Sequence, residues 1–344
     1  MADSRPTAEA ILSRAWQSRG VLACALWPLS LLFGALAALR RLLFALGIKR
    51  AECLPVPVIV VGNVFVGGTG KTPFAIWLIE ALRAAGLHPG VISRGYGGGN
   101  GAGQTLEVSP EAAASQVGDE PLLIAQRTGV PLVVGRRRVA AARSLLAAHP
   151  EVDVIISDDG LQHYALGRDI EIVLSDARGV GNGWLLPAGP LREPASRRRD
   201  FSVLNVGLQG SAPAGVHAMR LQADEAVQLA PPQARKPLAQ MGEGGVRLAA
   251  VAGIGHPERF FATLEGAGLS FARHPLPDHY DFAIDPFAGL AADVILITEK
   301  DAVKCRAIEA IRNDPRIWVV PVTARIDGAL AEHIVEKLRE RPTA

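Results

Sequence analysis

The sequence has few cysteines, few aromatic residues and almost no net charge, and each scarcity excludes a class of protein. The three cysteines Cys24, Cys53 and Cys305 lack metal-ligand spacing and cannot form a disulfide framework, which predicts reduced thiols in a cytosolic compartment. Aromatic residues make up 5% of the chain, so we expect a mainly aliphatic core. With a net charge of +2, no nucleic-acid partner is expected, and no pattern indicates a protein partner.

Apolar residues, by contrast, are abundant. The chain of 344 residues is 49% hydrophobic and 20% charged, which excludes a disordered protein and allows a substantial core. This length is enough for one large domain or two of ordinary size.

The N-terminal region contains the longest uncharged segment. Residues 20–39 carry no charge, and two basic pairs follow, Arg40-Arg41 and Lys49-Arg50. Twenty apolar residues just reach the thickness of a hydrocarbon core, although Pro28 interrupts the run. A cleaved signal and a buried helix of a soluble domain are the alternatives. We predict a membrane-associated helix within residues 1–50, with the basic residues at anionic headgroups, and leave open whether it spans the membrane or lies on it.

From residue 56 onward, short β-branched runs alternate with helical stretches. Alternating strands and helices predict an α/β fold with a parallel twisted sheet. Because residues 67–72 read Gly-Gly-Thr-Gly-Lys-Thr directly after the first predicted strand, we place a P-loop NTPase core in residues 51–210. A smaller C-terminal α/β domain is placed in residues 246–344. Residues 211–245, rich in Gly, Pro, Ala and Gln without a sustained period, are interpreted as a linker.

A glycine-rich loop lies between the first predicted strand and the helix that follows it. Its residues are Gly67, Gly68, Thr69, Gly70, Lys71 and Thr72. Strand, glycine-rich loop, Gly-Lys-Thr and helix form the context in which backbone N–H groups bind phosphate. Lys71 is expected to bridge the β- and γ-phosphates of ATP, and the Thr72 hydroxyl to ligate Mg²⁺. One position departs from the usual pattern, because Phe65 stands where a glycine is common.

An acidic motif farther along the chain completes the predicted nucleotide site. The apolar run 152–157 delivers Asp158 and Asp159 to the edge of the sheet where ligands of α/β proteins bind. A carboxylate there would serve as a ligand of Mg²⁺, and Asp158 is the candidate, although the sequence does not divide magnesium ligation and alignment of the base or substrate between Asp158 and Asp159. The segment 298–301 has its lysine one position too late for a guanine-reading motif, so ATP is the predicted nucleotide.

Several further motifs occur in a specific order along the chain. They lie at residues 66–73, 93–97, 117–121, 158–163, 186–193, 252–261, 278–279 and 298–304. With this ordered set, the chain resembles the tetraacyldisaccharide 4′-kinases of lipid A biosynthesis over nearly its whole length. The resemblance implies transfer of the ATP γ-phosphate to the 4′-hydroxyl of a membrane-bound tetraacylated glucosamine disaccharide 1-phosphate, forming lipid IVA for lipopolysaccharide. It also implies that the lipid acceptor and the inner membrane surface are partners, and that the enzyme works at the cytoplasmic face of the bacterial inner membrane.

The resemblance also assigns roles to individual residues. It makes Asp119 the base that takes the proton of the acceptor hydroxyl and His279 the partner that orients Asp119. From the residues alone, Asp119 would be an ordinary helix-start residue and His279 a structural one. The remaining expected catalytic residues are Lys71, Asp158, Asp159, Arg138 and Arg192, the arginines meeting the transferring phosphoryl group. Expected substrate contacts are Arg94, Tyr96, Glu120, Gln162 and His163. The basic run Arg197-Arg198-Arg199 is either a contact for anionic lipid or the substrate 1-phosphate, or only a charged surface.

A rival interpretation is a membrane-associated P-loop ATPase that acts as a conformational switch. It would share the phosphate loop and the apolar helix but would not need Asp119 and His279. A non-catalytic nucleotide-binding scaffold is a third possibility, and it would retain its biological activity after Asp119→Ala.

Overall fold

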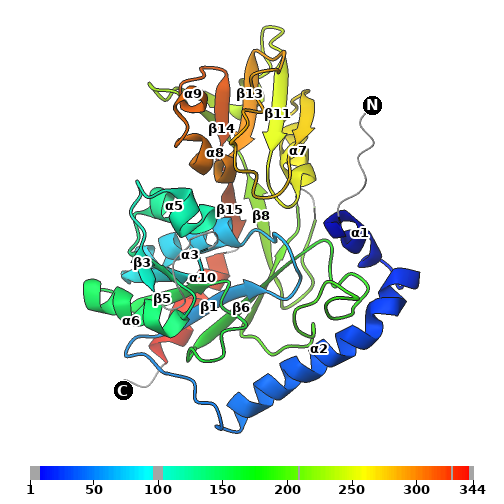
Figure 1. Cartoon of the computed structure of the whole chain (residues 1–344). Coiled ribbons are helices and arrows are strands. Elements are labelled where there is room, and N and C mark those ends of the chain that lie inside the picture. Colours follow the sequence, from blue (N-terminus) through cyan, green and yellow to red (C-terminus); the bar gives the residue numbers. More distant parts are fainter. Residues whose placement is uncertain (1–7, 96–103, 208–209, 327, 341–344) are drawn as a thin grey trace.

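The computed structural model describes residues 8–95, 104–207, 210–326 and 328–340. Two β-sheets organise these residues, a large one in the lower half of Figure 1 and a smaller one in the upper half. A long apolar helix runs along the outside of the lower half.

The large sheet has nine strands in the order β15-β8-β7-β6-β1-β5-β2-β4-β3. The central strand β1 is buried at all six positions and pairs in parallel with β5 and β6. Such a strand reads as a continuous apolar run, which is why it could be located from the sequence. The strands are β1 (Val58–Asn63), β2 (Pro89–Ser93), β3 (Thr105–Glu107), β4 (Leu132–Gly135), β5 (Val154–Asp158), β6 (Ile170–Asp176), β7 (Phe201–Asn205), β8 (His217–Gln222) and β15 (Thr323–Ile326).

Helices cover both faces of the large sheet. On one face lie α3 (Lys71–Ala84), α5 (Asp119–Thr128) and α10 (Gly328–Arg339), and the short α4 (Ala114–Val117) precedes α5. On the other face, α6 (Arg138–Ala148) packs through Ala141, Ala142 and Leu145. Both cores are largely aliphatic, as the scarcity of aromatic residues predicts.

The small sheet has six strands in the order β10-β9-β14-β13-β11-β12. Its strands are β9 (Glu225–Gln228), β10 (Arg235–Pro237), β11 (Leu248–Ala252), β12 (Ala272–Pro275), β13 (Val294–Thr298) and β14 (Ile317–Val320). Its helices are η1 (Leu238–Gln240), α7 (Pro257–Gly266), α8 (Glu299–Cys305) and α9 (Glu309–Arg312). Here the core is partly aromatic, with Phe260, Phe261, Phe282 and Phe287 buried.

The chain passes between the two sheets twice, and the two passages lie side by side. β8 is followed after two residues by β9, and β14 is followed after two residues by β15. β8 pairs antiparallel with β15, and β9 pairs antiparallel with β14. We call this pair of passages the two-stranded ribbon; Figure 1 shows β8 and β15 adjacent where they rise toward the upper sheet.

The ribbon changes the interpretation of residues 211–245. The expected linker contains β8, β9, β10 and η1, and β8 belongs to the large sheet whereas β9 and β10 belong to the small one. These strands are three to six residues long and partly exposed, so their side chains leave little hydrophobic period to detect. The last helix, α10, likewise returns to the large sheet and packs on α3.

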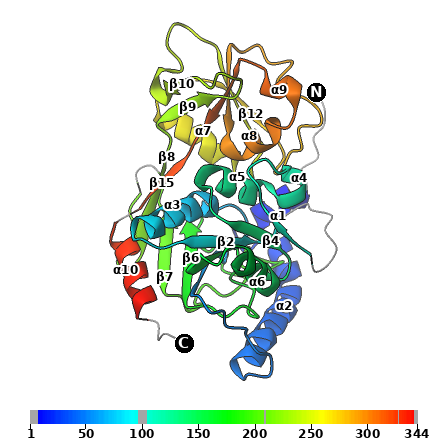
Figure 2. The ribbon, with the colours of Figure 1, turned by 90° about the vertical axis from the view of Figure 1, so that its left-hand side faces the viewer.

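The N-terminal helices α1 (Ala8–Ala15) and α2 (Val21–Ala45) lie outside both sheets (Figure 2). α2 is long and apolar enough to cross a membrane by length and composition, and most of its residues are not buried. Ser30, in the middle of α2, nevertheless bonds to the body: its hydroxyl donates to the Leu185 carbonyl and accepts from the Ala188 N–H, both at 2.9 Å.

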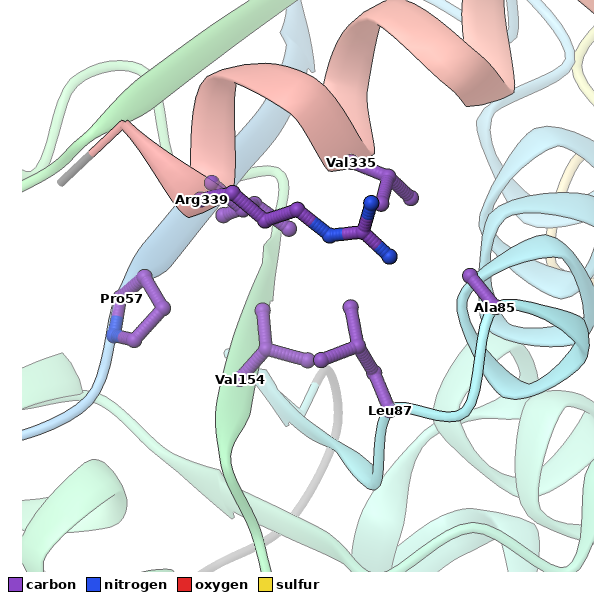
Figure 3. Close-up of a pocket in the computed structure, with 7 residues that line it drawn as sticks. Pro57, Ala85, Leu87, Val154, Val335 and Arg339 are labelled. Carbon is purple, nitrogen blue, oxygen red and sulfur yellow. The ribbon is translucent and has the colours of Figure 1, made fainter.

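A small cavity of about 110 Å³ lies under α10, at the opposite end of the large sheet from the phosphate loop. Figure 3 shows Val335 and Arg339 of α10 above Pro57 and Val154, which stand at the amino ends of β1 and β5. Because ligands of parallel sheets bind at the carboxyl ends of the strands, this cavity is not the nucleotide site.

Candidate active site

The phosphate loop connects the carboxyl end of β1 to the first turn of α3. Gly67 and Gly70 have φ values of 102° and 94°, in the left-handed region that favours glycine. A Cβ on Gly70 would also stand 2.9 Å from Met219. At the unusual position 65, the Phe65 ring packs under the Arg178 guanidinium at 4.4 Å.

Lys71 is held on the inner side of this loop. Its ammonium lies 3.1 Å from the Asn63 side-chain oxygen and 3.4 Å from Asp159. Asn63 ends β1, and its amide also donates to the carbonyls of Phe65 and Gly67. One amide side chain therefore fixes both the lysine and the loop, a role that the sequence analysis did not identify.

The two neighbouring aspartates after β5 have different environments. Asp158 is 2% exposed, and burial, together with the charges of Glu120 and Asp159, raises its pKa to about 7. Burial also opposes ionisation of Asp159, but Lys71 and Arg192 outweigh it and lower the pKa of that carboxyl. Asp159 is therefore a paired anion, whereas the carboxyl group of Asp158 has no cation at hydrogen-bond distance among the described residues.

The donor set fits a magnesium ion coordinated by few protein groups. Asp158 accepts a bond from the Ser93 hydroxyl at 3.2 Å, while its Oδ1 is buried without a hydrogen-bond partner among the described residues. Within that part of the chain there is no group of three or more His, Cys, Asp or Glu side chains that could hold a metal. Mg²⁺ needs no such cage, since it binds one or two carboxylates and fills its shell with water and phosphate oxygens.

Asp119 and His279 meet across the two sheets. His279 Nδ1 lies 3.2 Å from Asp119 Oδ2, although the two residues are 160 positions apart. Asp119 begins α5, and His279 follows β12 in a left-handed conformation with φ of 56°. Lys304 of α8 approaches the same Asp119 oxygen at 3.1 Å.

Glu120, the next residue of α5, links this pair to the phosphate loop. Its carboxylate lies 3.1 Å from the Lys300 ammonium. Burial opposes its ionisation, but Lys300 and Lys71 lower the pKa of Glu120 below its ordinary value. Lys300 and Lys304 come from one face of α8, and the sequence analysis missed both although it singled out their motif.

The remaining predicted residues are distributed around this centre. Arg192 contacts Asp159 at 3.3 Å. Arg138 is buried and donates to the carbonyls of Gly135 and Asp158, so its expected contact with the phosphoryl group stays a prediction. Burial and the charges of Arg138, Arg94 and Arg40 lower the pKa of His163 to about 4. Tyr96 lies outside the described residues.

Gln162 and Arg197 belong to a network centred on Glu193, which is 2% exposed. Glu193 accepts from Gln162 at 3.1 Å and from the Tyr164 hydroxyl at 2.7 Å, and it pairs with Arg197 and with Arg41 of α2. Arg197 is 8% exposed, so it is a structural ion-pair residue here rather than the surface contact for lipid considered above.

Fold and site together define a P-loop phosphotransferase: a phosphate loop with its lysine, a pair of aspartates beside it, and a carboxylate on the large-sheet side that pairs with a histidine from the small-sheet side. Comparison with known proteins makes this assignment specific. The family model for LpxK, tetraacyldisaccharide-1-P 4′-kinase, matches residues 22–339. The chain belongs to this family, as the motifs in its sequence predicted.

Two relatives are similar over their full length. A tetraacyldisaccharide 4′-kinase of Herminiimonas arsenicoxydans is 60% identical, with 98% of each chain covered. A tetraacyldisaccharide 4′-kinase of Janthinobacterium sp. (strain Marseille) is 58% identical, with 100% of each chain covered.

A solved structure shares the fold. The "apo" form of LpxK from Aquifex aeolicus, in complex with ATP, is similar with a TM-score of 0.75 and 28% identity, covering 92% of this chain and 100% of that chain. The predicted α/β P-loop fold is thereby confirmed, and the rival ATPase switch is not favoured.

Proposed function

We propose that the chain transfers the γ-phosphate of ATP to the 4′-hydroxyl of a tetraacylated glucosamine disaccharide 1-phosphate, forming lipid IVA. The observation that carries this proposal is the Asp119–His279 pair beside the phosphate loop. An ATPase switch needs a loop and a metal, but it does not need a base directed at a second substrate. Family membership and the near-complete match to two kinases support the same substrate.

In the proposed mechanism Asp119 accepts the proton of the attacking hydroxyl. Its side chain is 10% exposed, so little water competes for the proton, and His279 and Lys304 both approach one oxygen, Oδ2. The other oxygen, Oδ1, is then the one available to the acceptor. His279 and Lys304 hold the carboxylate in place, so that a general base is positioned for the acceptor hydroxyl.

Cations that are already in position stabilise the negative charge on the transferring phosphoryl group. Lys71 and Arg192 both lie against Asp159, so the pair is arranged around one carboxylate before ATP binds. Preorganised charges of this kind cost no rearrangement during the reaction. We assign to Asp159 the orientation of Lys71 and Arg192, and to Asp158, together with Thr72, the ligation of Mg²⁺, which would neutralise phosphate charge when bound.

The acceptor is amphiphilic, and α2 supports a membrane location for the site. Its exposed residues include Leu32 and Leu36, at 58% and 59%. Because Ser30, at the middle of α2, bonds to the polar backbone of residues 185–188, we infer that the helix lies in the interface rather than crossing the bilayer. ATP is cytoplasmic, so the face concerned is the cytoplasmic side of the bacterial inner membrane.

The test is a phosphoryl-transfer assay with γ-labelled ATP and the lipid acceptor in mixed micelles. Labelled lipid is expected from the unaltered chain, and free phosphate without labelled lipid would instead support the ATPase switch. Asp119→Asn should reduce lipid phosphorylation by about two to four orders of magnitude. Asp153→Asn is the matched control, because Asp153 lies at the other end of β5 and pairs with His88. Equal activity of the two variants would remove Asp119 from the mechanism.

A further inference from the structure

The carbonyl of Gly68, in the middle of the phosphate loop, accepts hydrogen bonds from two guanidinium groups. Arg178 donates at 2.9 Å from the segment that follows β6, and Arg259 donates at 2.9 Å from the first turn of α7. We propose that Arg259 is a positioning residue for the phosphate loop, through which the small-sheet part of the molecule fixes the loop in its ATP-binding shape. This inference rests on the ATP-binding role of the loop and not on the identity of the acceptor.

Peptide geometry relates the Gly68 carbonyl to the N–H group of the next residue. The Gly68–Thr69 peptide bond is trans, so the Gly68 carbonyl and the Thr69 N–H point in opposite directions. Two arginines that hold the Gly68 carbonyl therefore turn the Thr69 N–H away from themselves. Phosphate oxygens are expected on the side to which the N–H groups of such a loop point.

The neighbouring peptides of the loop follow the same pattern. Asn63 holds the Gly67 carbonyl at 2.9 Å, and Asn205 donates to the Thr69 carbonyl at 3.4 Å. The N–H groups of Gly68, Thr69 and Gly70 are thus each directed away from the side-chain donor that holds the carbonyl of the same peptide. Fixed peptide orientations of this kind set the shape of a loop whose N–H groups bind an anion.

A buried carboxylate fixes the two arginines. Asp176, the last residue of β6, is 3% exposed and accepts from Arg178 at 2.7 to 3.1 Å. Arg259 pairs with the same carboxylate. Two guanidinium groups share one carboxylate, so one positive charge remains in excess beside the loop, and it favours the approach of a polyphosphate.

Arg259 differs from the other donors because of the sheet that carries it. Asn63, Arg178 and Asn205 follow or end strands of the large sheet, whereas α7 packs on β11 of the small sheet. α7 is anchored there by the buried Phe260 and Phe261, and both views show it at the end of the small sheet nearest the large one. The contact of Arg259 with Gly68 therefore depends on the relative placement of the two sheets. Through this contact, the shape of the phosphate loop depends on that placement as well.

The experiment compares Arg259→Gln, Arg259→Lys and Arg273→Gln in the full chain in detergent micelles. Arg273 is the matched control, since it pairs with Glu258 and Glu265 of the same helix but does not touch the loop. The measurements are the KM values for ATP and for lipid, and the Kd of a fluorescent ATP analogue. Thermal unfolding reports any loss of α7.

Arg259→Gln is expected to raise the KM and Kd for ATP about tenfold, the effect of one charge-assisted hydrogen bond, and to leave the lipid KM nearly unchanged. Arg259→Lys should recover part of the affinity, because lysine keeps the positive charge. The recovery should be incomplete, because one ammonium cannot bridge Asp176 and Gly68 as a guanidinium does. Arg273→Gln should leave ATP affinity at the level of the unaltered chain.

Unchanged ATP affinity in Arg259→Gln would overturn the proposal. So would equal changes in the ATP and lipid constants that match a lower melting temperature, because these would identify a merely structural arginine. The analogue Kd needs no lipid, so a chain that binds ATP through Arg259 but fails to phosphorylate the acceptor would refute the proposed function and leave this inference standing.

Discussion

Replacing Asp158 with asparagine should stabilise the metal-free protein in alkaline solution while it abolishes transfer. The unfolded chain ionises this carboxyl from its ordinary pKa of 3.8, whereas the native state retains the proton up to a pKa of about 7, because the group is buried near Glu120 and Asp159. The native state binds more protons between these values, so its stability falls as the pH rises from 3.8 to about 7 and is level above.

The size of the effect follows from the shift. The difference of roughly three between the two pKa values, at about 1.4 kcal/mol for each, means that ionisation of Asp158 lowers the free energy of unfolding by about 4 kcal/mol above pH 7. At about pH 5.5 the free energy of unfolding is lowered by roughly half of that amount. Asparagine keeps the acceptor for the Ser93 hydroxyl and carries no charge, so Asp158→Asn should gain about 2 kcal/mol more stability at about pH 8.5 than at about pH 5.5.

The assay is urea unfolding in buffer with a chelator at both pH values. Asp293→Asn is the control: hydrogen bonds from Arg247 lower the pKa of Asp293 to about 2, so both pH values lie above its titration, and its effect should not differ between them. The reasoning is refuted if Asp158→Asn destabilises the protein equally at the two pH values. Loss of transfer in the same variant, despite a gain in stability, would be consistent with a carboxylate retained for its ligand.

Three further changes have defined outcomes. Lys71→Met should lower kcat by about two to three orders of magnitude in the labelled-phosphate assay, and a near-normal kcat would reject its role. Phe261→Ala, at a fully buried position of α7, should cost about 3–5 kcal/mol in urea unfolding, and less than about 1 kcal/mol would mean that α7 is not anchored as described. Leu36→Asp on the exposed face of α2 should weaken co-sedimentation with anionic vesicles and leave the transfer rate in detergent nearly unchanged; equal binding would remove α2 from the interface.

The sequence was most informative where chemistry and local structure coincide. β1, the phosphate loop and α3 are contiguous, so their residues could be assigned from one stretch of sequence. β5 and the aspartates after it were equally accessible, because an apolar run buried on both faces ends at two charges. The Asp119–His279 pair, separated by 160 positions, came only from the family resemblance.

The sequence was least informative where a side chain acts on distant backbone. Nothing local to Asn63, Arg178 or Arg259 indicates that their donors converge on the carbonyls of the phosphate loop. For the same reason Arg197 resembled a surface residue, since its partners Glu171 and Glu193 are brought to it by the fold. The strands of residues 217–237 were missed because short, half-exposed strands have little periodic signal.

The two-stranded ribbon has a mechanical consequence. A single peptide tether would let the upper part swivel about any axis, but two antiparallel strands joined by ladder hydrogen bonds resist torsion and shear. The ribbon can still bend out of its own plane. We expect this bending at residues 223–224 and 321–322, where the ladder of hydrogen bonds is interrupted. Any movement of one sheet relative to the other would thereby be restricted to nearly one degree of freedom, and such a movement would change the distance between His279 and Asp119.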